Sequence, residues 1–185
     1  MPDGFKLTDR IKLQDKEFRL AITPSQINEA VSKISDNINN DLAGENPLFL
    51  SILNGSFMFT SDLMKRIRMN CQVSFLKLSS YKGSSSTGTV NELIGFNEDI
   101  KGRSVVILED VIDTGITIEI ILNQLKPREP KQIKIATLLL KPGTFKKNIH
   151  LDYVGIEIPD DFIVGYGLDY MQLGRNLAGI YKIVS

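Results

Sequence analysis

The chain has 185 residues, of which 42% are hydrophobic and 24% are charged, and its 22 lysines and arginines balance 22 aspartates and glutamates. These values are typical of an ordinary globular domain and argue against a disordered or fibrous chain. The zero formal net charge provides no global basic excess for binding nucleic acid and no acidic or basic tail, so we expect no nucleic-acid partner.

The N-terminal residues 1–16 are polar and lack the apolar core of a signal peptide. No run of ~18 apolar residues follows, so we expect no membrane span. The single cysteine, Cys71, opens an apolar run and is expected to be a buried hydrophobe, while the lone His150 is expected at the surface. Together these features predict a cytoplasmic protein.

Few sequence patterns that indicate a helix, a strand or a site occur before residue 46. The first clear pattern is an apolar run over residues 48–53. The run ends at Asn54-Gly55, which predicts a buried strand followed by a tight turn. Ser56 is placed to cap the helix that follows. The apolar stripe of that helix consists of Phe57, Leu63, Met64 and Ile67.

A strand is expected over residues 71–78, and a low-complexity stretch of glycine, serine and threonine follows at residues 83–89. Small polar residues cannot build a core, so a flexible connector is one interpretation of this stretch. Because the stretch lies inside a domain, an active-site lid is the other interpretation.

Strands and helices then alternate along the chain. We expect a strand at residues 105–108, a helix at 117–125 and a strand at 133–140. Further short strands are expected around residues 153–155, 162–164 and 180–184. This alternation predicts an α/β fold with a parallel sheet and helices on both faces.

Parallel sheets of this kind bind ligands at the carboxyl ends of their strands. The loops that begin at Asn54, Glu109 and Lys141 are therefore the places where we expect the functional site.

The segment 105–117 combines a buried strand, two adjacent acids and a turn that opens a helix. The N–H groups of residues 113–117 would point out of the helix N-terminus, where they favour a phosphate. Gly115 would let the backbone approach that anion, and the hydroxyls of Thr114 and Thr117 would add hydrogen bonds.

The two adjacent acids, Glu109 and Asp110, could accept hydrogen bonds from a vicinal diol or hold Mg²⁺ through water. The alternative is that these acids and Asp113 only favour or cap the helix. Three acids so close together exceed what capping needs.

The segment 108–117 resembles the PRPP-binding signature of the type I phosphoribosyltransferases, where PRPP is phosphoribosyl pyrophosphate. Other segments are similar to the hypoxanthine (hypoxanthine-guanine) phosphoribosyltransferases of that family, and the match runs in order from about Pro47 to the C-terminus. The similar segments are 53–59 for the pyrophosphate loop, 80–89 for the lid, and 137–142, 152–160 and 162–175 for the base-binding half.

This resemblance implies the type I phosphoribosyltransferase fold, in which a central, mainly parallel sheet is flanked by helices and the chain ends form a small hood. It implies a single domain over residues 1–185, with a core at about 46–165 and a hood from about 1–30 and 166–185. The implied activity is purine salvage, in which a magnesium-dependent transferase joins PRPP to N9 of hypoxanthine, or of guanine, and releases pyrophosphate. Homodimers or homotetramers are usual in the family.

The resemblance also implies a role for each matching residue. Asp113 is expected to be the general acid/base at purine N7, and Lys141 to donate to the purine 6-oxo group and so reject adenine. The Leu53-Asn54 peptide is expected to be cis. The remaining roles fall to Glu109, Asp110, Asp113, Thr114, Gly115, Ile116 and Thr117 for PRPP; Asn54, Gly55 and Arg175 for pyrophosphate; Phe162, Ile163 and Asp169 beside Lys141 for the base; Ser80 and Tyr81 for the lid; and Glu109, Asp110 and Asp169 for Mg²⁺.

Two positions depart from the family's pattern. Position 54 is Asn where Lys or Arg is common, and position 116 is Ile where some members have Lys. Two rival functions remain open: a regulator that binds PRPP as an effector, and an enzyme for another base such as xanthine or adenine.

Overall fold

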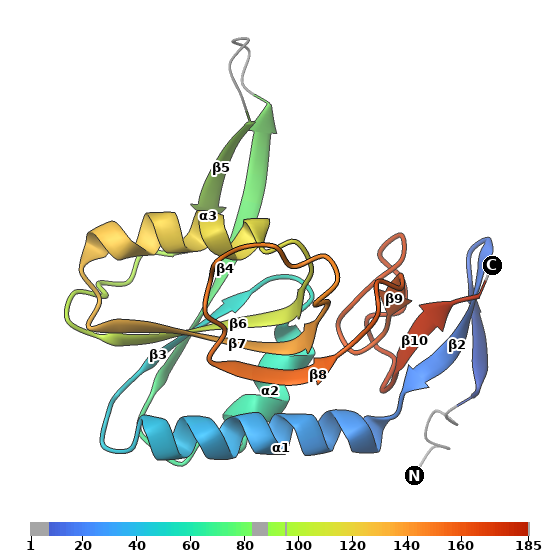
Figure 1. Cartoon of the computed structure of the whole chain (residues 1–185), viewed down its shortest axis with the longest axis horizontal. Helices are drawn as coiled ribbons and strands as arrows, with labels where there is room; N and C mark the ends of the chain where they lie inside the picture. Colours follow the sequence, from blue (N-terminus) through green and yellow to red (C-terminus); the bar gives the residue numbers. More distant parts are fainter. Residues whose placement is uncertain (1–7, 83–88, 95, 185) are drawn as a thin grey trace.

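The computed structural model describes residues 8–82, 89–94 and 96–184. The described chain forms a six-stranded sheet with helices on both faces, and a smaller four-stranded sheet lies beside it (Figure 1). The first sheet is the expected α/β core, and the second sheet joins the two ends of the chain.

The strand order of the larger sheet is β5-β4-β3-β6-β7-β8. Its strands are β3 (Leu48–Ile52), β4 (Gln72–Lys82), β5 (Thr89–Ile94), β6 (Ser104–Ile112), β7 (Gln132–Leu140) and β8 (Tyr153–Glu157). All neighbouring strands are parallel except β4 and β5, which pair antiparallel. The central strands β3 and β6 and the second half of β7 are buried on both faces, which explains why they read as continuous apolar runs in the sequence.

Helices cover both faces of this sheet (Figure 1). Helix α3 (Ile116–Leu125) lies on one face and ends in a 3₁₀ turn (Lys126–Arg128), whereas α1 (Pro24–Asp41) and α2 (Phe57–Met64) lie on the other face. Each face therefore has its own apolar core. Among the described residues, no helix is long and apolar enough to cross a membrane.

Helix α1 was not predicted, although the sequence contains its start signal. Thr23 and Gln26 form a capping box, in which each side chain bonds to the backbone N–H of the other residue, and Pro24 occupies the first turn. The buried stripe of the helix consists of Ile27, Ala30, Val31, Ile34, Ser35 and Ile38. Its three- and four-residue spacing is typical of an amphipathic helix.

The smaller sheet has the order β1-β2-β10-β9 and is antiparallel throughout. Its strands are β1 (Arg10–Leu13), β2 (Lys16–Ile22), β9 (Ile163–Val164) and β10 (Ile180–Ile183). Phe18, Val164 and Tyr181 form its small core. The predicted fold class is confirmed, including a hood made by the chain ends; the predicted residue boundaries of core and hood stay a prediction.

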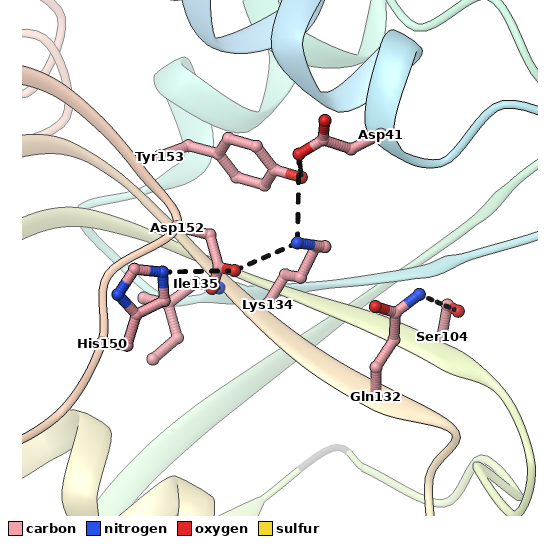
Figure 2. Close-up of polar contacts among 8 residues, drawn as sticks. All are labelled: Asp41, Ser104, Gln132, Lys134, Ile135, His150, Asp152 and Tyr153. Carbon is pink, nitrogen blue, oxygen red and sulfur yellow. Dashed lines mark hydrogen bonds and ion pairs between the residues drawn. The ribbon is translucent and has the colours of Figure 1, made fainter.

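A polar cluster fastens α1 to the sheet at the amino-terminal ends of β7 and β8 (Figure 2). The Tyr153 hydroxyl donates to Asp41 at the end of α1 over 2.9 Å, and the Lys134 ammonium lies 3.1 Å from Asp152 and 3.9 Å from Asp41. Because ligands bind at the carboxyl ends of the strands, this cluster lies away from the expected site.

The single histidine and the single cysteine of the chain also lie outside the expected site. The His150 side chain is 86% exposed and 3.9 Å from Asp152, so its predicted surface position is confirmed (Figure 2). Cys71 is half-buried against the α1 side of the core rather than fully buried, and burial raises the pKa of its thiol.

Replacing Thr23 with Ala should destabilise the protein, because it removes the side chain that caps α1. The expected loss in the free energy of unfolding is about 1 kcal/mol, measured by urea denaturation. Ser25→Ala provides a control in the first turn of the same helix, because Ser25 is exposed and does not cap it. Equal losses in the two variants would contradict the role of the capping box.

Candidate active site

Strand β6 contains two adjacent buried carboxylates near its carboxyl end. Glu109 and Asp110 are 8% and 9% exposed, and neighbouring side chains of a strand point to opposite faces. Burial, and then the charge of Asp110, raise the pKa of Glu109 well above its ordinary value. Burial also raises the pKa of Asp110 to about 6, although the Val111 N–H donates to its carboxylate over 3.0 Å.

These two carboxylates line two different cavities. Glu109 lines a small one of about 80 Å³ with Thr114, Gly115 and Thr117, and its Oε2 atom is buried without a hydrogen-bond partner. Asp110 lines a larger cavity of about 430 Å³. The other predicted residues lining that cavity are Asn54, Gly55, Asp113, Lys141, Phe162, Ile163, Asp169 and Arg175.

The start of α3 presents backbone N–H groups to the small cavity. The N-cap residue is Gly115, which has a φ of 82° and no side chain to bond the first N–H groups. The Ile116 N–H makes only a 3.5 Å contact with the Thr114 hydroxyl. The N-cap alternative for Asp113 is therefore wrong, because the helix begins two residues later, and the helix start remains available for an anion.

Lys141 lies between two carboxylates at the end of β7. Its ammonium is 3.2 Å from Asp113 and 3.1 Å from Asp160, and its side chain is only 11% exposed. Burial favours a lower pKa for Lys141, but the hydrogen bonds to Asp160 and Asp113 outweigh it. The pKa of Lys141 therefore lies above its ordinary value. A hydrogen bond from Thr144, followed by the contact with Lys141, holds the pKa of Asp113 below its usual value.

On the other side of the cavity, the loop after β3 contains the predicted cis peptide between Leu53 and Asn54, which is confirmed. Ser56 follows at the N-cap position of α2, so its predicted position is confirmed. Its hydroxyl does not bond to the helix N–H groups, however, because it donates to the Ile52 carbonyl and bonds to Ser51.

The loop after β9 packs against this turn. A Cβ atom at Gly167 would lie 1.9 Å from the Gly55 carbonyl oxygen, and one at Gly55 would lie 1.5 Å from Asp110 Oδ2. Arg175 then reaches back, donating to the Gly167 carbonyl over 2.7 Å and pairing with Asp169 over 2.5 Å. The two glycines thus allow three segments of the chain to meet at the cavity.

Phe162 and Ile163 line the hood side of the same cavity. The Phe162 ring is supported from behind by Tyr170, whose centroid is 5.9 Å away and nearly perpendicular, and by Phe18 at 6.4 Å. Phe162 is still 48% exposed and lines the cavity, so part of its ring is available to a planar ligand.

Of the remaining predicted residues, Ile116 lies outside both cavity linings. Ile116 is 52% exposed at the first position of α3. Ser80 and Tyr81 lie in β4, where it pairs with Asn91 and Val90 of β5 in a hairpin that extends beyond the sheet (Figure 1). The predicted lid stretch falls mainly on residues 83–88, which lie outside the described residues.

Sequence reasoning missed Asp160 and Thr144, which contact the Lys141–Asp113 pair. Thr144 follows the Pro-Gly turn after Lys141, and Asp160 follows Pro159, so both were visible as polar residues in loops. Their distance in sequence from Asp113 concealed the contacts.

No group of three or more His, Cys, Asp or Glu side chains gathers to hold a metal within the described part of the chain. Asp110 and Asp169 nevertheless line one cavity, and the charge of Asp169 contributes to the raised pKa of Asp110. Two carboxylates with this unfavourable interaction suit a cation that keeps several waters and takes further ligands from a substrate, as Mg²⁺ does.

The chain is similar to known proteins over most of its length. Residues 23–171 match the model of the phosphoribosyl transferase domain family. The chain is 39% identical over 180 residues to a hypoxanthine phosphoribosyltransferase of Buchnera aphidicola, covering 97% of this chain and 98% of that protein. It is 41% identical over 160 residues to a hypoxanthine-guanine phosphoribosyltransferase of Streptococcus pneumoniae, covering 86% and 89% of the two chains.

Solved structures agree with this likeness. The crystal structure of a hypoxanthine phosphoribosyltransferase from Staphylococcus aureus superposes with a TM-score of 0.82 at 36% identity, covering 90% of this chain and 91% of the other. That of a hypoxanthine-guanine phosphoribosyltransferase from Bacillus anthracis gives a TM-score of 0.81 at 35% identity, covering 89% and 96%.

Replacing Asp110 with Asn should stabilise the free protein near neutral pH. Folding raises the pKa of this carboxyl from 3.8 to about 6, so the folded state binds more protons between those values. The stability linked to this group is therefore full below about pH 4 and falls as the pH rises through 6. Asn carries no charge and can still accept from the Val111 N–H.

The expected gain is on the order of 2 kcal/mol at pH 7.5, and it should vanish at about pH 4. Urea denaturation at both pH values, without divalent cations, measures it. Asp99→Asn is the charge-matched control at an exposed position. A gain of the same size at both pH values would rule out burial of the charge as its cause.

Proposed function

The chain belongs to the phosphoribosyltransferase family, and we propose that its activity is that of a hypoxanthine(-guanine) phosphoribosyltransferase in purine salvage. It transfers the 5-phosphoribosyl group of PRPP to N9 of a 6-oxopurine and releases pyrophosphate. The observation that carries this proposal is the larger cavity, where Asp113, Lys141 and Phe162 meet Asp169 and Arg175. One cavity thus combines groups for a planar base with groups for an anion.

The two cavities suit the two ends of PRPP. The helix start at Gly115 and Thr117 would hold the 5′-phosphate through N–H and hydroxyl groups. Arg175, together with the Asn54-Gly55 turn, would hold the pyrophosphate. Between them, Glu109 and Asp110 would accept hydrogen bonds from the two ribose hydroxyls, which would give the unpaired Glu109 Oε2 a partner.

The base would lie between Phe162 and Lys141. The aromatic ring provides a stacking surface, and the ammonium can donate to a 6-oxo group. Adenine presents an amino group at that position, which would leave the buried ammonium facing a donor. Hypoxanthine, guanine and xanthine share the 6-oxo group, and the residues above do not rank them.

Asp113 would take the proton that the base loses. The bond from purine N9 to ribose C1 forms as the bond from C1 to the pyrophosphate oxygen breaks, and the proton on N7 passes to the Asp113 carboxylate. In the free protein, Lys141 helps to lower the pKa of Asp113. When Lys141 donates to the base, Asp113 loses part of this stabilisation and becomes a stronger base.

Mg²⁺ would be held by Asp110 and Asp169 through water and by the pyrophosphate of the substrate. When bound, it supplies positive charge that stabilises the leaving pyrophosphate. Arg175 neutralises one of these acids in the free protein, since it pairs with Asp169.

We also propose that the protein acts in the cytoplasm as a homo-oligomer. The single Cys71 suits a reducing compartment. The side chains of Val73 and Phe75 on β4 and of Phe57 on α2 are each more than 40% exposed, and such apolar groups suit a contact between copies of the chain.

Asp113→Asn should lower turnover of hypoxanthine or guanine by ~10²-fold or more, because an amide cannot accept the N7 proton. A spectrophotometric assay with PRPP, Mg²⁺ and each of hypoxanthine, guanine, xanthine and adenine measures it. Asp160→Asn makes the same charge change on the other side of Lys141 and should cost far less. No turnover of any base by the parent protein, despite PRPP binding, would favour the PRPP-binding regulator instead.

Removing divalent cations with a chelator should abolish turnover, and added Mg²⁺ should restore it. Asp169→Asn should raise the Mg²⁺ concentration needed for half-maximal rate about tenfold, since one carboxylate that orients the ion is lost. Asp161→Asn is the matched control, because Asp161 pairs with Lys182 instead. Full activity in the chelator would refute the magnesium site.

A further inference from the structure

The small cavity at the start of α3 has acidic side chains but no basic side chain in its described lining, although a phosphate is negatively charged. Its described lining includes the acids Glu109 and Asp113 but no Lys, Arg or His. The first helical residue is Ile116, which is exposed and carries no charge. A phosphate dianion bound there would gain from a cation, and that cation must come from outside the lining.

The loop after β7 brings a lysine to this helix start. A Cβ atom at Gly115 would lie 2.7 Å from the Phe145 ring and 3.1 Å from Cγ of Lys147. The stem of Lys147 therefore packs against the same glycine that turns the backbone toward the anion.

The head of Lys147 is held close to the helix start by an acid of the first turn. Its ammonium is 2.7 Å from Glu119, and the Glu119 N–H donates to the Gly115 carbonyl over 3.0 Å. Both side chains are partly exposed, at 34% and 43%. An exposed ion pair of this kind contributes little stability, so the ammonium can leave Glu119, or share its three donors, at small cost.

We propose that Lys147 is a binding residue for the 5′-phosphate of PRPP and of the nucleotide product. Glu119 holds its ammonium near the helix start in the free protein, and the phosphate recruits it on binding. Lys147 then provides the cation that Ile116 does not. This inference rests on the proposed function, which assigns the helix start to the 5′-phosphate.

The first probe is ribose 5-phosphate, because it binds without any reaction. Lys147→Met keeps the apolar stem and removes the charge, so the Kd of ribose 5-phosphate, measured by calorimetry, should rise about tenfold. Lys146→Met is the matched control on the neighbouring exposed lysine and should leave the Kd unchanged. Ribose, which lacks the phosphate, should bind Lys147→Met and the parent protein equally.

Glu119→Gln separates this proposal from a purely structural ion pair. If Lys147 binds phosphate, releasing it from Glu119 should lower the Kd or leave it unchanged, opposite to the effect of Lys147→Met. If the pair only braces the loop, both variants should raise the Kd together, and the proposal is overturned. An unchanged Kd in Lys147→Met would also overturn it.

Kinetics extend the test to the reaction. Lys147→Met should raise the KM for PRPP about tenfold and leave the KM for hypoxanthine unchanged. If the parent protein turns over no base, the proposed function fails, but ribose 5-phosphate binding still decides the role of Lys147. The two failures are therefore distinguishable.

Discussion

The buried carboxylates near the carboxyl end of β6 are the constraint to which the rest of the site is fitted. A charge inside a sheet core is costly unless it is paired or protonated, and burial raises the pKa of both Glu109 and Asp110. Their neighbours are shaped around them: Gly55 lacks a Cβ that would collide with Asp110, and Gly167 packs in turn on Gly55. Under the proposed function, the ribose hydroxyls and a magnesium ion would lower the cost of burying these two charges.

The parallel sheet that holds these carboxylates explains why the site is built from distant parts of the chain. A parallel sheet aligns the carboxyl ends of β3, β6 and β7, so Asn54, Asp110 and Lys141 meet although they are far apart in sequence. The hood adds Phe162 and Arg175 from the opposite side. It can do so because both chain ends pair in one small sheet that stands beside the larger one (Figure 1).

The parallel sheet and most of the residues that line the cavities could be predicted from the sequence, because buried strands and a phosphate-binding turn leave local patterns. Contacts between distant segments could not, and so Asp160 and Thr144 were missed beside Lys141. Helix α1 was not predicted, although the sequence contains a local signal for it, the capping box that begins at Thr23. The alternative role of Asp113 as the cap of α3 is excluded because Gly115, with its positive φ, is the N-cap residue instead.

Charge balance connects the two ends of the site. In the free protein, every described cation that lines the larger cavity already has an acidic partner: Lys141 pairs with Asp113 and Asp160, and Arg175 pairs with Asp169. Under the proposed function, the 6-oxo group of the base would draw Lys141 from Asp113, and the pyrophosphate would draw Arg175 from Asp169, so each exchange would free a carboxylate. At Asp113 the freed carboxylate would be a stronger base, and at Asp169 it would become available to the proposed magnesium ion. In the proposed reaction, binding of the substrates would thus prepare the groups that the chemistry needs, which a site with unpaired lysines and arginines would not achieve.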